Sequence, residues 1–320
     1  MQEAIEEAIG LPIAQNTFIE ANTKEIELLE MNEKHVIPVF TKFNEPLISH
    51  SDFIEVVGEV AQEIFARDLI LEPSVRVSHP VQGRIPEARN KPAKELLEHE
   101  KTLYYERMAF TIEIPTIYDT IEGSRLSLTV GGVKAYNLDN YNSSRKDQHF
   151  KIFIGFKNSV CTNLCIATDG FKSDLVVKDV HELKRQVQAL ISNYDANVGL
   201  EALKTLAPAK FSEEEVAYLV GRLKMYPYLK PEHQSLISRL NVTESQLNTM
   251  LSGHFEDNHF RRNSDGGTNL WRLYNNVTGA IKSSYIDTYF DKCANALSFM
   301  QELGRAKLGE QNNAYWYLEQ

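Results

Sequence analysis

The stretch Ser124-Arg-Leu-Ser-Leu-Thr-Val-Gly-Gly-Val-Lys-Ala-Tyr136 decides the fold class of this chain of 320 residues. Within it, Leu126, Leu128 and Val130 recur at every second position, which indicates a β-strand with two distinct faces. The segment 109–114 alternates in the same way. Strands of this kind, separated by turn residues, predict an antiparallel sheet.

Similar runs of β-branched and aromatic residues continue on both sides of this stretch. They predict a sheet core at about 74–167, with strands at 75–81, 109–114, 124–136, 150–157 and 160–167. The Gly131-Gly132 pair inside the third run predicts a bulge or a sharp turn. Residues 93–100 follow Pro92 and predict a short helix.

Helical patterns flank the sheet region. Before it, apolar residues at helical spacing over 53–65 predict a helix that Ser51 or Asp52 caps. After residue 173 the pattern is helical almost to the end, and the last long helix, 270–303, breaks at most once near Gly279. The predicted fold class is α+β: an antiparallel sheet core with packed helices, followed by an all-helical C-terminal region.

We divide the chain into an acidic N-terminal arm and helix (1–72), a β-rich core (73–175) and a helical region (176–320). The chain has 34 Lys and Arg against 44 Asp and Glu, a net charge of −10. Residues 1–72 hold 4 of the former and 15 of the latter, so the remainder is about neutral. The acidity of the whole chain therefore does not exclude a local basic groove.

The sequence predicts a cytoplasmic protein that does not enter a membrane. No stretch reaches the roughly 18 consecutive apolar residues that a membrane span needs, and the first ten residues are acidic, unlike a secretion signal. Cys161, Cys165 and Cys293 are sparse and odd in number, which favours a reducing compartment and buried thiols over disulfides.

No metal, cofactor or catalytic motif has the required spacing. His254 and His259 lie five apart, so an ideal helix places them on different sides, and HExxH is absent. Gly266-Gly267 lacks the Lys and Ser or Thr of a phosphate-binding loop and indicates a turn before a helix. We expect no cofactor and no metal, and an enzyme is the least supported class of function.

Two helical patterns have both a nucleic-acid-binding interpretation and an ordinary packing interpretation. Residues 236–251 have the shape of a helix-turn-helix in which Glu244 and the polar residues after it would face a DNA groove, although a plain helical hairpin is favoured. The helix from 270 combines aromatic residues with Arg272 and Lys282, as in proteins that stack on bases. The helical spacing of those aromatics is more typical of core packing.

Two blocks resemble a known family. The first is Lys157-Asn-Ser-Val-Cys-Thr-Asn-Leu-Cys-Ile-Ala-Thr-Asp-Gly170, and the second is Asn269-Leu-Trp-Arg-Leu-Tyr-Asn-Asn-Val-Thr-Gly-Ala-Ile-Lys-Ser-Ser-Tyr-Ile-Asp287, followed by Asn295-Ala296. They resemble a family of domains of unknown function carried on phages, plasmids and integrated elements, over about 36–318. The resemblance implies a mobile-element setting and supplies no catalytic residues.

The polar residues of these blocks have two interpretations. They form a functional surface, or they form a buried hydrogen-bond network that joins the sheet to the long helix, since buried polar groups must be satisfied. The residues are Asn163, Asp169, Asn269, Asn275, Ser283, Ser284 and Asp287.

We therefore expect an accessory protein of a mobile element that binds nucleic acid without catalysis, in particular single-stranded DNA during replication, repair or transfer. The candidate contacts are cations of the sheet region and of the last long helix: Arg76, Arg84, Arg89, Lys91, Arg125, Lys134, Arg145, Lys146, Arg272 and Lys282. The alternative is an interaction protein whose acidic N-terminal region inhibits a host defence factor by acting as a decoy for its basic surface. Neither hypothesis fixes the oligomeric state.

Overall fold

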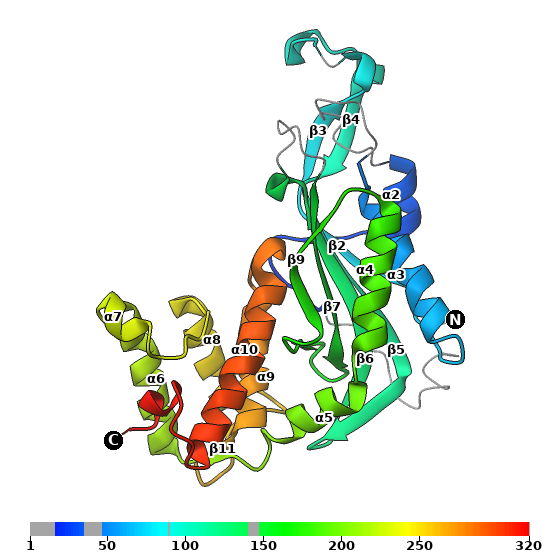
Figure 1. Cartoon of the computed structure of the whole chain (residues 1–320). Coiled ribbons are helices and arrows are strands. Elements are labelled where there is room, and N and C mark those ends of the chain that lie inside the picture. The colour runs from blue at the N-terminus through cyan, green and yellow to red at the C-terminus, as the bar shows by residue number, and fades with distance from the viewer. Residues whose placement is uncertain (1–16, 35–46, 89, 140–146, 320) are drawn as a thin grey trace.

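A computed structural model describes residues 17–34, 47–88, 90–139 and 147–319. Its centre is a seven-stranded antiparallel sheet in the order β1-β2-β5-β6-β7-β8, with β9 also paired to β7 (Figure 1). The strands of this sheet are β1 (Lys24–Glu25), β2 (Ser74–Val77), β5 (Arg107–Ile121), β6 (Ser124–Ala135), β7 (Gln148–Asn158), β8 (Leu164–Cys165) and β9 (Phe171–Val177).

Helices cover both faces of this sheet. The helices α3 (His50–Ile64) and α4 (Val180–Asn193) pack on one face, and α9 (Leu270–Ile281) and α10 (Ile286–Lys307) pack on the other (Figure 1). Because neither face meets water, β6 is buried along its whole length apart from the half-buried Arg125. The expected α+β architecture with a helical C-terminal region is confirmed.

The remaining elements surround this centre. The helices are α2 (Leu28–Lys34), α5 (Ala196–Lys204), α6 (Glu213–Met225), α7 (Pro231–Gln234) and α8 (Glu244–Glu256). The 3-10 helices are η1 (Pro86–Ala88), η2 (Ala93–Glu95), η3 (Glu98–Glu100), η4 (Tyr136–Leu138), η5 (Tyr226–Tyr228) and η6 (Tyr315–Tyr317). Two small sheets pair β3 (Pro80–Arg84) with β4 (Lys101–Tyr105), and β10 (Lys210–Phe211) with β11 (Thr268–Asn269).

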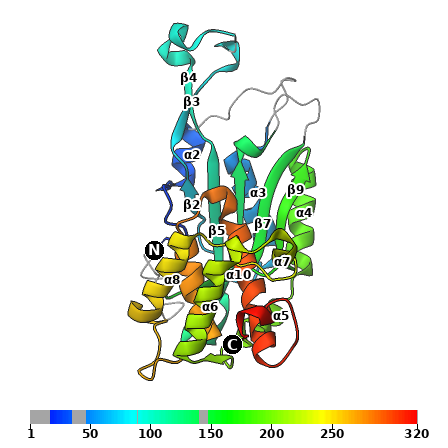
Figure 2. The same cartoon turned by 90° about the vertical axis from the view of Figure 1, so that its left-hand side faces the viewer.

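The β3–β4 ribbon projects away from the body of the molecule (Figures 1 and 2). It replaces the single strand expected at 75–81, which the structure divides between β2 and β3. The helix expected at 93–100 is present only as the two turns η2 and η3. Strand β9 was also missed, since a helical region was expected from residue 173 onward.

Gly131 and Gly132 do not form the expected bulge. Both pair in regular register with β5 and β7, and the irregularity of β5 lies between Ile114 and Tyr118 instead. A side chain on Gly132 would overlap the Phe53 ring of α3, and a side chain on Gly131 would overlap the Phe153 ring. The two glycines therefore make room for an aromatic ring on each face of the sheet.

The observed helix ends agree with those expected from the sequence, except at the start of α3 and at the break in the last long helix. Helix α3 is capped by Ser49, whose side chain accepts from the Asp52 N–H while Asp52 accepts from the Ser49 N–H; Ser51 is not the cap. The capping boxes that start α6 and α8 are present. The last long helix does break once, but at residues 282–285, just beyond Gly279.

The described N-terminal residues belong to the same core as the sheet. Phe18 and Ile19 are buried, and Phe53 of α3 contacts Phe110 and Phe150 at ring-centroid distances of 5.2 and 4.8 Å. Helix α3 thus supplies, together with α4, the helical layer on one face of the sheet. The division of the chain into three domains stays a prediction.

We expect Gly132→Ala to destabilise the protein by about 1–3 kcal/mol, because the new methyl group must displace the Phe53 ring in a packed core. Gly221→Ala is the matched control. Its Cβ would meet nothing within 4 Å on helix α6, where alanine is favoured over glycine by up to about 1 kcal/mol. Urea unfolding of both variants measures the difference, and an unchanged midpoint for Gly132→Ala contradicts the proposed role of the glycine.

Candidate functional site

The two family-like blocks meet in a buried hydrogen-bond network between the β7–β8 turn and α9. Asn158 Nδ2 donates to Asn275 Oδ1 at 3.1 Å, and Asn163 Nδ2 donates to the Asn275 carbonyl at 2.9 Å. Asn275 Nδ2 in turn donates to the Trp271 carbonyl at 2.9 Å. All three asparagines are at most 2% exposed. For Asn163 and Asn275, the structure therefore supports the buried network and not a functional surface.

Lys282 belongs to this network and is not a surface cation as expected. It is 4% exposed, and its ammonium donates to the Thr162 hydroxyl at 2.8 Å and to the Cys161 carbonyl. Thr162 has a φ of +57°, which costs a β-branched residue on the order of 1–3 kcal/mol. Burial lowers the pKa of Lys282. This lysine fixes the turn before β8 to the end of α9.

The other polar residues of the blocks do not form one surface. Asn269 is buried and caps α9 by accepting from the Arg272 N–H at 3.0 Å, and Ser284 is buried beneath Gln246 of α8, whose Nε2 donates to it at 2.7 Å. Asp287 is half-buried, 3.8 Å from the Arg107 guanidinium. Asp169 and Ser283 are exposed. The blocks are thus largely structural.

Lys134 also lies in the interior, which corrects its expected place on a basic surface. Its side chain is 0% exposed between α3 and the sheet, 3.5 Å from Asp139, 3.4 Å from Gln148 and 4.0 Å from the centre of the Phe150 ring. Burial lowers the pKa of Lys134 to about 8, against the opposing effect of the Asp139 carboxylate. No nucleic acid reaches this ammonium group in the folded protein.

Most other predicted cations are engaged within the chain. Arg76 binds Thr23 and Glu25, Lys91 binds Glu100, and Arg84 donates to the Lys91 carbonyl. Arg125 donates to the Pro115 carbonyl and stacks on Tyr118, and Arg272 binds Glu122 and Asn263. Arg89, Arg145 and Lys146 lie outside the described residues.

These cations are also far apart. Arg84 and Lys91 belong to the projecting β3–β4 region, whereas Arg125 and Arg272 lie at the opposite end of the sheet, beside the β5–β6 turn (Figure 1). They do not combine into one groove. Their contact with nucleic acid stays a prediction.

The described side chains do not assemble a metal centre. No group of three or more His, Cys, Asp or Glu in these parts of the chain could hold a metal ion. His254 is buried, which lowers its pKa, and His259 is exposed. The three cysteines are free thiols, and burial raises the pKa of Cys161 and Cys293 to about 12. No helix among the described elements is long and apolar enough to cross a bilayer.

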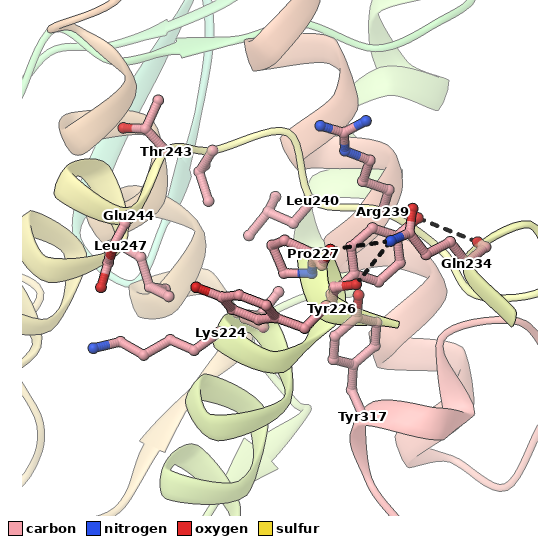
Figure 3. Close-up of a pocket in the computed structure, with 13 residues that line it drawn as sticks. Lys224, Tyr226, Pro227, Gln234, Arg239, Leu240, Thr243, Glu244, Leu247 and Tyr317 are labelled. Atoms are coloured by element: carbon pink, nitrogen blue, oxygen red, sulfur yellow. Dashed lines mark hydrogen bonds between the residues drawn. The ribbon is translucent and has the colours of Figure 1, made fainter. Parts of the chain in front are cut away.

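A pocket with unengaged charges lies between η5 and the start of α8, and we call it the η5–α8 pocket (Figure 3). Its volume of about 410 Å³ falls within the range of small-ligand sites. Its lining residues are Leu223, Lys224, Tyr226, Pro227, Tyr228, Gln234, Arg239, Leu240, Val242, Thr243, Glu244, Leu247 and Tyr317.

Hydrogen bonds fix the walls of the η5–α8 pocket. Gln234 Nε2 donates to the carbonyl of Tyr226 at 3.2 Å (Figure 3). It also donates to the carbonyl of Leu229 at 2.9 Å, and the two bonds close the turn from η5 to α7. Asn295 of α10 holds the opposite segment by donating to the Arg239 carbonyl at 2.9 Å. The Tyr317 hydroxyl donates to the Ser238 carbonyl at 2.7 Å. The pocket is therefore preformed, and its ligand need not order it.

The chemistry of the η5–α8 pocket combines aromatic walls with free charges. Tyr228 is 88% exposed, the highest exposure among large apolar and aromatic side chains in the described residues. Lys224, Arg239 and Glu244 are exposed, and none of the three forms an ion pair or a side-chain hydrogen bond with another described residue. A concave site lined by apolar and aromatic side chains together with a few polar or charged groups is typical of a ligand pocket.

The sequence located this region only in part. For 236–251 a plain helical hairpin was favoured over a helix-turn-helix. Neither is present, because α7 ends at Gln234 and the chain is not helical again until Glu244; Gln246 is also buried. The tyrosines of η5 were missed. The interleaved aromatic, basic and proline residues of 223–231 were the available signal, since this mixture suits base stacking beside phosphate contacts.

A second pocket of about 540 Å³ surrounds the start of α9 and includes Asn269 and Arg272. Most of its charges are paired, because Arg272 binds Glu122, Arg262 binds Glu213, and Lys307 binds Glu215; of its lining residues, Lys210 and Asp265 form no ion pair with a described residue. Gly266, with a φ of +83°, and Gly267 form a turn here, as expected. We therefore regard the η5–α8 pocket as the candidate site.

Sequence comparison places the chain in a family but gives no activity. The family model described as "Domain of unknown function, B. Theta Gene description (DUF3871)" matches residues 2–318. The chain belongs to this family. No curated protein and no solved structure matches it. Membership in a family of unknown function is therefore established, whereas a mobile-element origin is not indicated by the match.

We expect Asn275→Ala to cost about 1–3 kcal/mol of unfolding free energy, because the change leaves the Asn158 Nδ2 group without its hydrogen-bond acceptor in the core. Asp169→Asn, an exposed change within the same family-like blocks, is the control and should stay within about 0.5 kcal/mol of wild type. Chemical denaturation measures both. Equal stability of the two variants would show that the network does not support the fold.

Lys134 also gives the stability a defined pH dependence. Its pKa is about 8 in the folded protein against 10.5 as its ordinary value, so from pH 8 to 10.5 the unfolded chain binds more protons. Lys134 therefore lowers the free energy of unfolding by its full amount below pH 8, and this unfavourable contribution disappears as the pH rises from 8 to 10.5. We compare wild type with Lys134→Met/Asp139→Asn, which removes both charges.

The difference in unfolding free energy between these two proteins should shift in favour of wild type between pH 7.5 and 9.5, by at most about 1.4 kcal/mol per pH unit. Other titrating groups are common to both and cancel. A constant difference across this range contradicts the lowered pKa. Lys134→Met alone should cost about 3–5 kcal/mol, because it leaves Asp139 buried without its cation.

Proposed function

We propose that this chain binds single-stranded DNA, without catalysis, at the η5–α8 pocket. The observation that carries the proposal is the exposed Tyr228 in a pocket lined by the unengaged cations Lys224 and Arg239. Proteins that bind single strands combine these two components: aromatic rings stack on bases, and cations contact phosphates. Single-stranded DNA is the partner that the sequence also led us to expect, but we place its site at the η5–α8 pocket and not on the cations of the sheet and the last long helix.

The pocket suits a single strand better than a duplex. A base can stack on the exposed ring of Tyr228, at the edge of the pocket, only when that base is unstacked from its neighbours and unpaired. A helix-turn-helix would instead place a recognition helix in the groove of a duplex, and that motif, the less favoured interpretation of 236–251, is absent. The buried Gln246 also removes one of the residues expected to contact a groove.

The setting of this binding is part of the proposal. The family resemblance implies a phage or plasmid setting, and replication, repair and transfer all expose single strands. The alternative, inhibition of a host defence factor through the acidic N-terminal region, also stays a prediction. Several acids of this region bind cations of the chain itself: Glu59 and Glu63 bind Lys184, and Glu25 lies 3.6 Å from Arg76.

We expect Tyr228→Ala to weaken binding of a labelled 20-nucleotide single strand by about 5- to 150-fold, the range for loss of one stacking contact of 1–3 kcal/mol. Arg239→Ala should weaken it as well and reduce the slope of log affinity against log salt by about 0.7, the value for one lost phosphate contact on a single strand. Fluorescence anisotropy at several salt concentrations measures both.

Lys172→Ala/Lys178→Ala is the matched control, because both lysines are exposed, lie on or next to β9, and form no ion pair with a described residue. This variant should bind like wild type. Absence of binding by wild type at low salt would overturn the proposed function. Binding that the control weakens as much as the pocket variants would instead overturn the choice of site.

A further inference from the structure

We infer that the η5–α8 pocket selects guanine among the four bases; this rests on the proposed function. The inference concerns the third unengaged charge in the pocket, Glu244. A carboxylate in a site for a polyanion is unfavourable unless it contacts something other than phosphate. The base itself is the part of a nucleotide that offers hydrogen-bond donors, so the chemistry of Glu244 points to the base edge.

The position of Glu244 is fixed by its helix. It is the first residue of α8, directly after the N-cap Thr243, whose side chain accepts from the Gln246 N–H at 3.2 Å while Gln246 Oε1 accepts from the Thr243 N–H at 3.1 Å. Leu247, one turn further along α8, lines the same pocket (Figure 3). The carboxylate therefore starts from a rigid backbone and lines the pocket without a partner among the described residues.

An ionised carboxylate only accepts hydrogen bonds, and its two oxygens accept two parallel N–H groups at once. Guanine alone presents two adjacent donors on its pairing edge, N1–H and the N2 amino group, followed by the acceptor O6. Adenine, cytosine and thymine each place an acceptor beside any donor, so one carboxylate oxygen would face an acceptor.

Lys224 completes the match. It lines the same pocket from the end of α6 and offers only donors, so it complements O6 of a guanine whose N1–H and N2 amino group contact Glu244. The pair Glu244 and Lys224 thus presents acceptor, acceptor and donor, the complement of the guanine edge. Arg239 and Tyr228 are left for phosphate and stacking contacts.

The test uses labelled oligo-dT strands of one length with a single central dG, dA, dC or deoxyinosine, because one guanine cannot form a quadruplex. Wild type should bind the dG strand about tenfold or more tightly than the others, in line with the discrimination of a bidentate contact. Deoxyinosine, which lacks the N2 amino group, should lose most of that preference. Glu244→Gln should bind all four strands alike.

Glu232→Gln is the control: Glu232 is exposed on α7 but does not line the pocket, so this variant should keep the preference. Equal affinity of wild type for all four strands would overturn the guanine inference and leave single-strand binding intact. The same holds if Glu244→Gln keeps the preference. No binding of any strand would instead overturn the proposed function together with this inference.

Discussion

Burial of the sheet on both faces is the constraint on which the rest of this structure depends. The sheet can be enclosed only if helices approach it closely from each side, and the glycines at positions 131 and 132 permit this approach. Phe53 of α3 occupies the space over Gly132, and Phe153 occupies the space over Gly131 and meets Phe290 of α10 at 4.7 Å. Adjacent residues of one strand thereby serve opposite layers, since side chains alternate between the faces.

Because both faces of the sheet are covered, polar residues in the centre need hydrogen-bond partners within the protein. A buried polar group without a partner costs on the order of 1–3 kcal/mol, so polar residues at these positions must find each other. Asn158, Asn163 and Asn275 do so between β7 and α9, and Lys134 does so with Asp139 beneath α3. The family-like blocks therefore carry the contacts that hold the layers together. A binding surface has to lie elsewhere, on elements that the core does not constrain.

Local patterns were enough to predict the architecture, whereas contacts between distant segments were not. Alternation in 124–136 predicted β6, and the capping boxes predicted the starts of α6 and α8, because each pattern lies within one element. The Gly131-Gly132 pair was misinterpreted because the two rings that require it are distant in the sequence: Phe53 lies 79 positions before Gly132, and Phe153 lies 22 positions after Gly131. Lys134 looked like a surface cation because strand alternation does not reveal that both faces are covered. The candidate pocket draws on residues from 223 to 317, which no local motif unites.

The charge of the chain limits how the proposed site can obtain its affinity. A net charge of −10 repels a polyanion, and most cations in the described residues are already bound to carboxylates or carbonyls of the chain. Long-range attraction and a continuous basic track, the usual sources of non-specific affinity, are therefore weak here. The free energy of binding has to come from short-range contacts in a preformed pocket, where stacking and base-edge hydrogen bonds act within a few ångströms. A site of this kind contacts few nucleotides, and its affinity depends on which base occupies it.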